Sequence, residues 1–492
     1  MLRKDREIFE KYLFNPRSIA VIGASKTPGT WGNNAIRGLL SDKSRRIYAV
    51  NPNATEILRV KAFPNVKDIP DTVDLAIIVV SEKLVPGILS DCVTKGVKGA
   101  VIITSGFGEM GKDGQKLEAE LVRIAHKGGL RFIGPNSMGH ADTGTGLSTF
   151  GQGGEMQKGP AAVLSQSGST CLKIVRNLEA TGIACSKYIS TGNEADLRME
   201  DYLEYLADDE NTRVIAAYIE GLRDGRRFIK LAKKITTDKP IVVVKVGGTQ
   251  ESARAVMSHT GALAGADEIY TGAFKQSGVI RAEDDDELCD VVYALYNCPL
   301  PRGNRVGILS IGGGPGALTA EICEKEGLSI GKLSPATVKK LDELLSSRWP
   351  RRNPVDMAGP SAAEFSVVTE MLMPLIEDKN LDIVFVLAPI VLDKRMLVSR
   401  MGLNEKQVAE YQQKSEDNLK LLRENIEKHQ KPVVFLWQFR GTSQNSETAT
   451  LFSRQKMMVY SSSRQAARVM HLLERYGRYL RHMKKQLNIS RE

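Results

Sequence analysis

The chain repeats one local plan: a short run rich in β-branched residues, then a glycine-rich turn, then a stretch with the periodicity of a helix. The plan is clearest in the sequences SIAVIGAS, PAAVLSQSGS and RVGILSIGGGPG, which begin at Ser18, Pro160 and Arg305. Short buried strands that alternate with amphipathic helices are typical of parallel sheets with helical crossovers. The sequence therefore predicts the α/β class, with three doubly wound parallel sheets.

The domain organisation follows from length and from two breaks in this pattern. A chain of 492 residues is too long for one ordinary core, and a prior of about 150 residues per domain suggests three. The connection GLSTFGQGGEMQKGP and the turn CPLPRGN separate the three units. We expect a Rossmann-like domain at 1–145, further α/β domains at 146–300 and 301–480, and a basic C-terminal tail at 481–492.

Composition excludes several classes of protein. No apolar run approaches the roughly 20 residues that a membrane span requires. The N-terminal sequence MLRKDREIFEKYLFNPRS carries acids and lacks the continuous apolar stretch of a secretory signal. The six cysteines form no CxxC pair, which argues against a zinc site and a disulfide framework. We therefore expect a cytoplasmic protein with reduced cysteines.

The formal net charge of +10 raises the question of nucleic-acid binding. Residues 464–492 hold eight Lys and Arg against two Glu, so a net charge of +6 lies in this one segment. A solvated terminal helix explains that concentration, and the remaining excess could favour polyanionic ligands. No recognition motif or interleaved aromatic platform supports a nucleic-acid interface.

The first glycine-rich turn spans Gly23 to Gly32. Small residues let the backbone approach a phosphate there, and the next helix offers free N–H groups, although the glycines could equally serve packing alone. The spacing is not GxGxxG, and Asn51-Pro52 stands where an NAD site would have an acid, so NAD is disfavoured. The loops at 105–109 and 134–136 follow strands of the same unit, which favours a binding crevice at one sheet edge.

Two more turns have the same form. Ser165-Gln166-Ser167-Gly168 precedes a helix in the second unit, where hydroxyls and free N–H groups could hold a phosphoryl oxygen. The alternative is that a serine simply caps the helix. In the third unit the run from Gly312 to Gly316 is costly in unfolded-chain entropy, which suggests that a ligand or another backbone comes close to it.

His259 lies in MSHTGALAG, where small residues flank the imidazole, and we expect a mobile loop. The strand KPIVVVKVGG before it and the strand VIAAYIEG, which leads to Glu220, are joined by a helical crossover, so they should be neighbours in the sheet. A neutral imidazole can attack phosphorus while a carboxylate holds its other nitrogen. The alternative is that His259 only occupies a loop and Glu220 only caps a helix.

Together these motifs resemble the alpha subunit of the ADP-forming acyl-CoA synthetases, in the succinyl-CoA synthetase superfamily. The resemblance spans nearly the whole chain and rests on IAVIGAS, VNPN, SGFGE, GPNSMG, LSQSGS, STGNEAD, SHTGALAG and GGGPGALTAE. SHTGALAG is the most specific of these segments. The resemblance implies a Rossmann-like CoA-binding domain followed by two flavodoxin-like ligase domains.

The reaction that the resemblance implies interconverts acyl-CoA, phosphate and ADP with free acid, CoA and ATP. It passes through an acyl phosphate and phospho-His259, which Glu220 stabilises. The implied phosphate-binding residues are Ser165, Gln166, Ser167, Gly168, Gly312, Gly313, Gly314 and Gly316. The implied CoA-binding residues are Gly23, Ala24, Ser25, Lys26, Gly29, Gly32, Asn51, Pro52, Val80, Ser81, Ser105, Gly106 and Asn136, with Asn193 as a candidate near the acyl group and no metal ligand.

A partner protein is expected because the three predicted domains leave no room for a nucleotide-binding region. In this family an ATP-grasp region holds the nucleotide and Mg²⁺, and no stretch of about 200 residues is left to build one. We therefore expect ATP or ADP and Mg²⁺ on a separate ATP-grasp beta subunit, in a heterotetramer. The acyl group stays open between acetyl, branched or aromatic acids and dicarboxylates. The alternative is a non-catalytic CoA-binding regulatory or scaffolding protein, which would need neither His259 nor Glu220.

Overall fold

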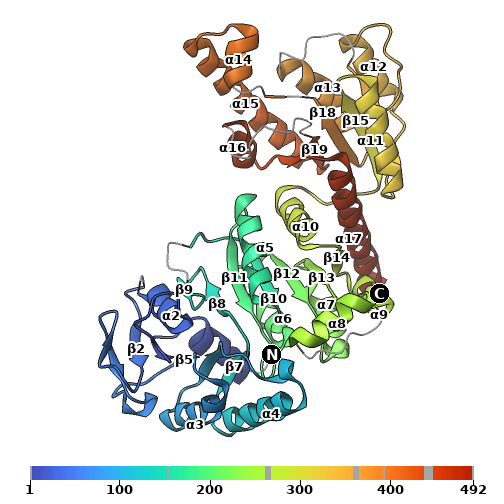
Figure 1. Cartoon of the computed structure of the whole chain (residues 1–492). Helices are drawn as coiled ribbons and strands as arrows, with labels where there is room; N and C mark the ends of the chain where they lie inside the picture. The colour runs from blue at the N-terminus through green and yellow to red at the C-terminus, as the bar shows by residue number, and fades with distance from the viewer. Residues whose placement is uncertain are drawn as a thin grey trace. The chain divides into compact units, whose positions relative to one another are not determined.

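The computed structural model divides the chain into two compact units, Met1–Val292 and Tyr293–Glu492. Figure 1 colours the first unit from blue to yellow-green and the second from yellow to red. The residues that the structure describes are 3–40, 42–151, 156–260, 267–357, 365–388, 390–391, 394–436 and 447–489. Within them the strands form three parallel-dominated sheets, which confirms the predicted α/β class.

The first sheet has the strand order β3-β4-β2-β1-β5-β6-β7. Its strands pair in parallel, except that β3 runs antiparallel to β4. The order reverses at β1, which has β2 on one side and β5 on the other, so the switch point lies between β1 and β5. The bounds are β1 (Ser18–Ile22), β2 (Arg46–Val50), β3 (Glu56–Ile57), β4 (Val60–Phe63), β5 (Leu75–Ile78), β6 (Gly99–Ile102) and β7 (Arg131–Ile133).

Helices of the first sheet pack through apolar stripes. In α4 the buried residues Gly114, Glu118, Leu121 and Ala125 recur at helical spacing, so one face of the helix is covered. α3 and α4 contact each other along the same face of the sheet, as Figure 1 shows. The bounds are α1 (Arg3–Glu7), the π-helix η1 (Ile8–Leu13), α2 (Trp31–Leu39), α3 (Val85–Lys95), α4 (Lys112–Lys127) and the 3-10 turns η2 (Val66–Asp68), η3 (Glu82–Leu84) and η4 (Gly108–Met110).

The second sheet has the strand order β14-β13-β12-β10-β11-β8-β9. Strands β10 to β14 pair in parallel, whereas β8 runs antiparallel to both β11 and β9. The order reverses at β10, so the switch point lies between β10 and β12. The bounds are β8 (Gly139–Asp142), β9 (Leu147–Ser148), β10 (Ala161–Ser165), β11 (Cys185–Ser190), β12 (Val214–Ile219), β13 (Ile241–Lys245) and β14 (Ile280–Ala282).

The first and second sheets share one hydrophobic core. A single cluster of buried side chains includes Ile19 of β1 and Leu164 of β10. At the N-terminus the rings of Phe9 and Phe14 stack on the ring of Tyr205, with centroid distances of 4.9 and 5.1 Å. The helices of the second sheet are α5 (Gly168–Ala180), α6 (Met199–Ala207), α7 (Gly225–Ile235), α8 (Gln250–Thr260), α9 (Asp267–Ser277) and α10 (Asp285–Asn297).

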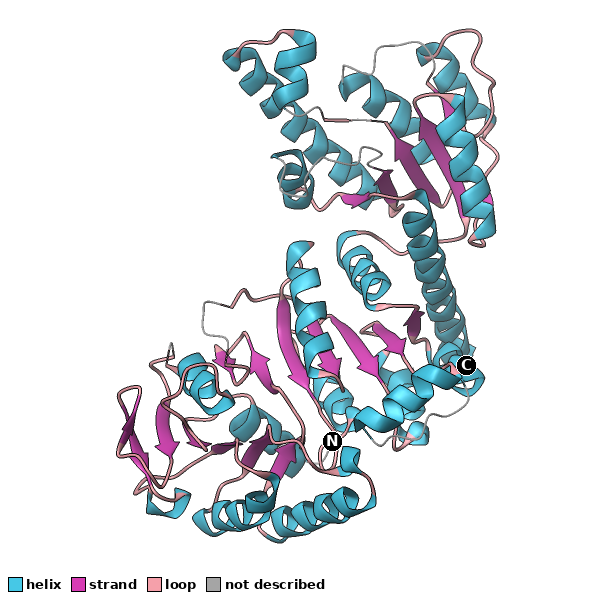
Figure 2. Cartoon of the chain, viewed as in Figure 1, coloured by secondary structure: helices cyan, strands magenta, loops and turns pink. Residues whose placement is uncertain are grey.

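The third sheet lies in the second unit, with the order β16-β15-β18-β19-β20 and β17 beside β15. Its pairings are parallel, and Figure 2 shows its magenta strands flanked by cyan helices. The strands are β15 (Arg305–Ser310), β16 (Ser329–Ile330), β17 (Val355–Asp356), β18 (Ile383–Leu387), β19 (Val433–Leu436) and β20 (Met458–Tyr460). The helices are α11 (Gly313–Lys325), α12 (Pro335–Leu344), α13 (Phe365–Glu377), α14 (Lys394–Met401), α15 (Glu405–His429), α16 (Glu447–Arg454) and α17 (Ser463–Ile489).

The expected domain limits differ from the sheets in detail. Strand β8 lies before the expected boundary at residue 145, yet it pairs with β11 of the second sheet. The segment expected as a tail begins inside α17, which continues to Ile489. The division into three domains remains a prediction. No helix among the described residues is long and apolar enough to cross a membrane.

Candidate functional site

The first turn brings two strand ends of the first sheet into direct contact. Gly23 follows β1 with φ +86°, and a Cβ placed on it would lie 1.9 Å from the carbonyl oxygen of Val79. A side chain at Gly32, in the first turn of α2, would lie 2.1 Å from the carbonyl oxygen of Gly23. These two glycines are therefore required by close backbone approach. The turn sits at the switch point between β1 and β5, where open α/β sheets bind ligands.

The remaining CoA-candidate residues lie at the carboxyl edge of the same sheet. Asn51, after β2, donates its side-chain amide to the carbonyl oxygen of Ala24 at 2.8 Å and so holds the first turn. At Gly29 an added Cβ would meet open space, so this glycine leaves room above the turn. The other candidates follow β1, β2, β5, β6 and β7, and they are Ser25, Lys26, Pro52, Val80, Ser81, Ser105, Gly106 and Asn136.

The switch point of the second sheet joins the serine-rich turn to Glu220. The side-chain oxygen of Gln166 accepts hydrogen bonds from the backbone nitrogens of Glu220 at 2.6 Å and Gly221 at 3.0 Å. Its side-chain nitrogen donates to the carbonyl oxygen of Gly221 at 2.8 Å. One amide group therefore satisfies three backbone atoms after β12, and the buried Glu220, 3% exposed, is fixed beside the start of α5.

The start of α5 is itself ordered by serine hydroxyls. Ser165 donates its hydroxyl to the carbonyl oxygen of Ser167 at 2.6 Å. Ser167 is the N-cap, and its hydroxyl accepts the backbone N–H of Thr170 at 3.4 Å. A Cβ on Gly168 would collide with the side chain of Met138, so the helix begins close to the neighbouring segment. The arrangement suits an anion at the helix N-terminus. Ser167 also caps the helix, as the alternative interpretation of this turn predicted.

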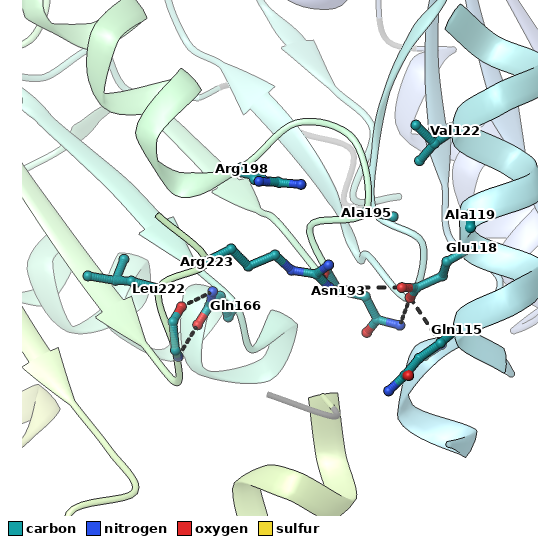
Figure 3. Close-up of a pocket in the computed structure, with 13 residues that line it drawn as sticks. Gln115, Glu118, Ala119, Val122, Gln166, Asn193, Ala195, Arg198, Leu222 and Arg223 are labelled. Carbon is teal, nitrogen blue, oxygen red and sulfur yellow. Dashed lines mark hydrogen bonds and ion pairs between the residues drawn. The ribbon is translucent and has the colours of Figure 1, made fainter. Parts of the chain in front are cut away.

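A pocket of about 690 Å³ lies between α4 and the loops that follow β11 and β12. Figure 3 shows one wall formed by α4 and the opposite wall formed by Gln166, Leu222 and Arg223. Both walls belong to the first unit. The lining residues are Gly108, Gln115, Glu118, Ala119, Val122, Gln166, Gly192, Asn193, Ala195, Arg198, Gly221, Leu222 and Arg223.

Asn193 connects the two walls of this pocket. Its side-chain nitrogen donates to Glu118 at 2.8 Å and to Glu109 at 2.5 Å. Its side-chain oxygen accepts from the side chain of Asn136 at 3.3 Å, and its carbonyl oxygen accepts from Arg223 at 2.8 Å. The candidate acyl residue Asn193, labelled in Figure 3, and the candidate CoA residue Asn136 are thus brought together.

Two buried carboxyl groups at the site were not singled out from the sequence. Burial raises the pKa of Glu118, although hydrogen bonds from Asn193 and from the Gly108 backbone act in the opposite direction. Burial also raises the pKa of Glu194 to about 7. Glu194 lies beside Asn193 in the motif STGNEAD, but its burial depends on the later packing of α6, which no local pattern announces. In the described ranges, no group of three or more His, Cys, Asp or Glu is placed to hold a metal ion.

The segment around His259 differs from the expected loop. Of the expected loop at 257–265, residues 257–260 belong to the helix α8 (Gln250–Thr260), while residues 261–265 and the side chain of His259 lie outside the described residues. The predicted strand order is confirmed, because β12 pairs directly with β13 and Ile219 lies opposite Lys245. α8 contacts η4, which carries the pocket residue Gly108.

The glycine run of the third predicted domain, Gly312 to Gly316, starts the helix α11, which lies in the second compact unit. Gly312 precedes α11 with φ +94°, and its backbone nitrogen donates to the carboxylate of Asp356 at 3.0 Å. A Cβ on Gly316 would lie 3.1 Å from the side chain of Pro354, whereas Gly314 faces open space. The helix start is therefore shaped partly by packing and partly left accessible. All four candidate glycines of this run belong to the second compact unit: Gly312, Gly313, Gly314 and Gly316.

Family models match the two sheets of the first unit. The model of a CoA binding domain matches residues 17–142. The model of a succinyl-CoA ligase like flavodoxin domain matches residues 158–295. The two matches divide the unit close to the polar connection between its sheets.

Similarity to characterised proteins extends over most of the chain. It is 47% identical over 373 residues to subunit alpha of the ADP-forming acetate–CoA ligase II of Pyrococcus furiosus, covering 76% of this chain and 80% of the relative. It is 43% identical over 373 residues to the ADP-forming acetate–CoA ligase I of Archaeoglobus fulgidus, covering 76% of this chain and 54% of the relative.

A solved structure has the same fold. It is the Ca. Korarchaeum cryptofilum dinucleotide forming acetyl-coenzyme A synthetase 1 in complex with phosphate and ADP, with 31% identity and a TM-score of 0.82. The match covers 98% of this chain and 99% of that chain. The motifs, the two domain models and these relatives agree, and the chain belongs to the ADP-forming acyl-CoA synthetases, a family of ligases.

Proposed function

We propose that this chain is the alpha subunit of an ADP-forming acyl-CoA synthetase and carries the phosphoryl group on His259. The observation that carries the proposal is the amide of Gln166, which joins the start of α5 to the backbone at Glu220 and Gly221. A helix N-terminus attracts an anion, and a buried carboxylate beside it can hold an imidazole. The pocket of about 690 Å³ next to these groups gives room for the reacting ends of the substrates.

The chemistry takes two steps on this chain. A phosphate oxygen attacks the thioester carbon of acyl-CoA, the C–S bond breaks, CoA leaves as the thiol, and an acyl phosphate forms. A nitrogen of His259 then attacks phosphorus, the bond between phosphorus and the acyl oxygen breaks, and the carboxylate leaves. Glu220 holds the other ring nitrogen and stabilises the positive charge that the ring gains. The amides before α5 hold the phosphoryl oxygens.

CoA is assigned to the carboxyl edge of the first sheet. The close contact between Gly23 and Val79 forms the floor of the crevice at the β1/β5 switch point, and Asn51 braces the turn above it. The exposed Lys26 supplies a positive charge for the CoA phosphates. Asn193 lies where the two walls of the pocket meet and is assigned to the acyl carbonyl. The acyl group itself remains open between acetyl, branched, aromatic and dicarboxylic acids.

The second half-reaction requires a partner. Phospho-His259 passes its phosphoryl group to ADP, and we assign ADP and Mg²⁺ to a separate ATP-grasp beta subunit, in a heterotetramer. The name of the Pyrococcus furiosus relative includes subunit alpha, and the Archaeoglobus fulgidus relative is matched over 54% of its own length. Both facts fit a nucleotide-binding part that lies outside the matched region.

A labelling experiment tests the first half-reaction. The purified chain is incubated with acetyl-CoA and radiolabelled phosphate, and protein-bound label is tested for the acid lability of a phosphohistidine. Label is expected in the wild type, is absent in His259→Ala, and is reduced in Glu220→Gln because the ring loses its carboxylate partner. His482→Ala is the matched control, because His482 is exposed on α17 and should leave the label unchanged.

The same experiment separates catalysis from a regulatory role. If the wild type binds CoA but takes up no label, with other acyl-CoA substrates tried as well, the non-catalytic alternative is favoured. Adding the ATP-grasp chain co-purified from the native host, with ADP and Mg²⁺, should move the label from His259 to ATP. Persistence of full label in His259→Ala would overturn the proposed carrier.

A further inference from the structure

Glu194 is a buried acid in an unusual backbone conformation. Its side chain is 1% exposed, and its φ of +55° lies in the left-handed region, directly after Asn193 and Gly192. A residue other than glycine persists in this region only where its surroundings hold it there. In the described part of the chain no Lys, Arg or His lies within ion-pair distance of Glu194. Its charge is therefore stabilised by hydrogen bonds rather than by a cation.

Two donors lie within hydrogen-bond distance of the Glu194 carboxylate. Thr191 donates its hydroxyl at 2.8 Å, and the backbone nitrogen of Met199 donates at 3.2 Å. The side chain of Gln166 lies close enough to lower the pKa of Glu194. Thr191 in turn donates its backbone nitrogen to the carbonyl oxygen of Ser165 at 2.8 Å. The carboxylate is thus linked through Thr191 to Ser165, the last residue of β10 at the β10/β12 switch point.

The other hydrogen bonds of Gln166 determine which atom of its side chain can face Glu194. Its oxygen is already used by the backbone nitrogens of Glu220 and Gly221, and its nitrogen donates to the carbonyl oxygen of Gly221. The remaining hydrogen of that nitrogen is the donor available to Glu194. A carboxylate on this side therefore favours the amide orientation that holds Glu220.

We propose that Glu194 is a positioning residue for phosphoryl transfer: through Gln166 and Thr191 its carboxylate fixes Glu220 and the turn before α5. The inference rests on the proposed function of His259 and Glu220 and adds a residue that does not touch the substrate. It also gives the site a dependence on pH. Protonation turns one acceptor oxygen of Glu194 into a donor that faces an existing donor, so the contacts that the charged carboxylate makes are weakened.

The surroundings set where this protonation occurs. Burial and the nearby Glu200 raise the pKa of Glu194, while hydrogen bonds from Thr191 and Met199 and the amide of Gln166 lower it, and together they place the pKa at about 7. Tyr202 of α6 also lies within electrostatic range and is itself buried. The charged form that holds Gln166 is therefore favoured above about pH 7 and is lost as the pH falls through it.

The test follows phosphohistidine formation in the full chain from about pH 5.5 to about pH 9. Glu194→Gln should be slower by roughly tenfold to a hundredfold at high pH, because a misplaced catalytic group costs about that much. It should also lose the part of the acidic decline that Glu194 causes in the wild type. Glu194→Asp should recover part of the rate at high pH, because it restores a charged acceptor.

A matched control separates this role from a general effect of burial. Glu200 is also 1% exposed, and burial also raises its pKa, but nearby backbone groups rather than Gln166 act on its carboxylate. Glu200→Gln should keep the high-pH rate and move the acidic decline to lower pH, because one source of repulsion on Glu194 is removed. Equal losses in Glu200→Gln and Glu194→Gln, with unchanged pH profiles, would overturn the inference.

A double-mutant cycle keeps the inference testable if Glu194→Gln folds poorly. If Glu194 acts through Gln166, adding Glu194→Asp to Gln166→Ala should cost much less than it costs in the wild type. Independent, additive losses would overturn the inference. Normal rates in all Glu194 variants with an inactive His259→Ala would refute the positioning role alone. Full turnover in His259→Ala would refute the proposed function instead.

Discussion

At the scale of single residues, the site depends on two neighbours whose side chains serve different partners. Asn193 donates to Glu109 and Glu118 at the pocket, whereas Glu194 accepts from Thr191 and Met199 in the interior. The left-handed conformation at Glu194 lets adjacent residues satisfy both sets of contacts. Each neighbour gives a separate prediction about pH.

The first prediction concerns stability. The folded-state pKa of Glu194 is raised from 4.5 to about 7, so the folded state holds its proton more tightly than the unfolded state. The stability from this group is fully present below the unfolded pKa and is lost as the pH rises through the folded pKa. Chemical denaturation should show that wild type loses up to about 3 kcal/mol relative to Glu194→Gln between about pH 4.5 and pH 8. Parallel stability curves for the two proteins would contradict this expectation.

The second prediction concerns Asn193→Asp. The substitution keeps the shape of the side chain but replaces two donated hydrogen bonds with a carboxylate that faces Glu109 and Glu118. We expect a loss of about 2 kcal/mol at pH 8 that shrinks at acidic pH, because protonation of the cluster restores donors. Asn177→Asp is the control: its amide is exposed and donates to Asp286, so the same exchange should cost less than about 0.5 kcal/mol. Equal losses of stability in the two variants would show that Glu109 and Glu118 do not make the exchange at Asn193 more costly.

At the scale of elements, α4 forms one wall of the pocket because it lies very close to η4. Gly114 is buried on the covered face of α4, and a Cβ there would lie 1.6 Å from the carbonyl oxygen of Phe107. Gly108 in η4 is tied to Glu118 by its backbone nitrogen at 3.0 Å. The spacing of these two elements therefore positions Glu118 toward Asn193.

This contact gives a prediction for two glycines in similar helices. Gly114→Ala should destabilise the protein by at least about 2 kcal/mol, because the backbone of α4 must move away from η4. Gly87→Ala in α3 should be neutral or stabilising by up to about 1 kcal/mol, because its new methyl group meets open space. Urea denaturation of both variants measures the difference, and equal values would contradict the close contact.

The parallel strands could be predicted from the sequence because they are continuous β-branched runs. SIAVIGAS, LAIIVV and LDIVFVLAPIV became β1, β5 and β18. The helix α15 likewise has a local signal, because Asn404 is its N-cap and the helix is rich in Glu, Lys and Gln. Strands β8 and β9 were missed, because GHAD and LS lack a hydrophobic pattern and are strands only through distant pairing with β11.

Local motifs likewise predicted part of the site. Glycine turns and serine caps are local signals, and so the turns at Gly23, Ser167 and Gly312 could be read directly. The amide bridge from Gln166 and the burial of Glu194 could not, because each depends on residues about 30 to 50 positions away or on the packing of α6. The helix at His259 was read as a loop because its small residues resemble a turn.

At the scale of the whole molecule, the chain consists of two compact units with separate hydrophobic clusters. Proteins of this kind commonly unfold in more than one step. Calorimetry of the full chain should therefore show two transitions. CoA at about 100 times its Kd should stabilise only the first unit, by about 2.7 kcal/mol, and raise one transition by about 5 °C.

A control for this prediction uses the turn that holds the crevice. Gly23→Ala places a methyl group against Val79 and should abolish the shift caused by CoA, because the turn can no longer lie against β5. The transition of the second unit should not change in this variant. Equal shifts of both transitions with CoA would contradict the assignment of the ligand to the first unit.

The stacked rings of Phe9, Phe14 and Tyr205 limit how this protein can be divided. A cut at residue 145 would strip the N-terminal segment of its aromatic neighbour on α6 and remove β8 from beside β11. Both fragments would then expose apolar surface to water and would tend to aggregate. We therefore expect the two halves of the first unit to be stable only when they are expressed as one piece.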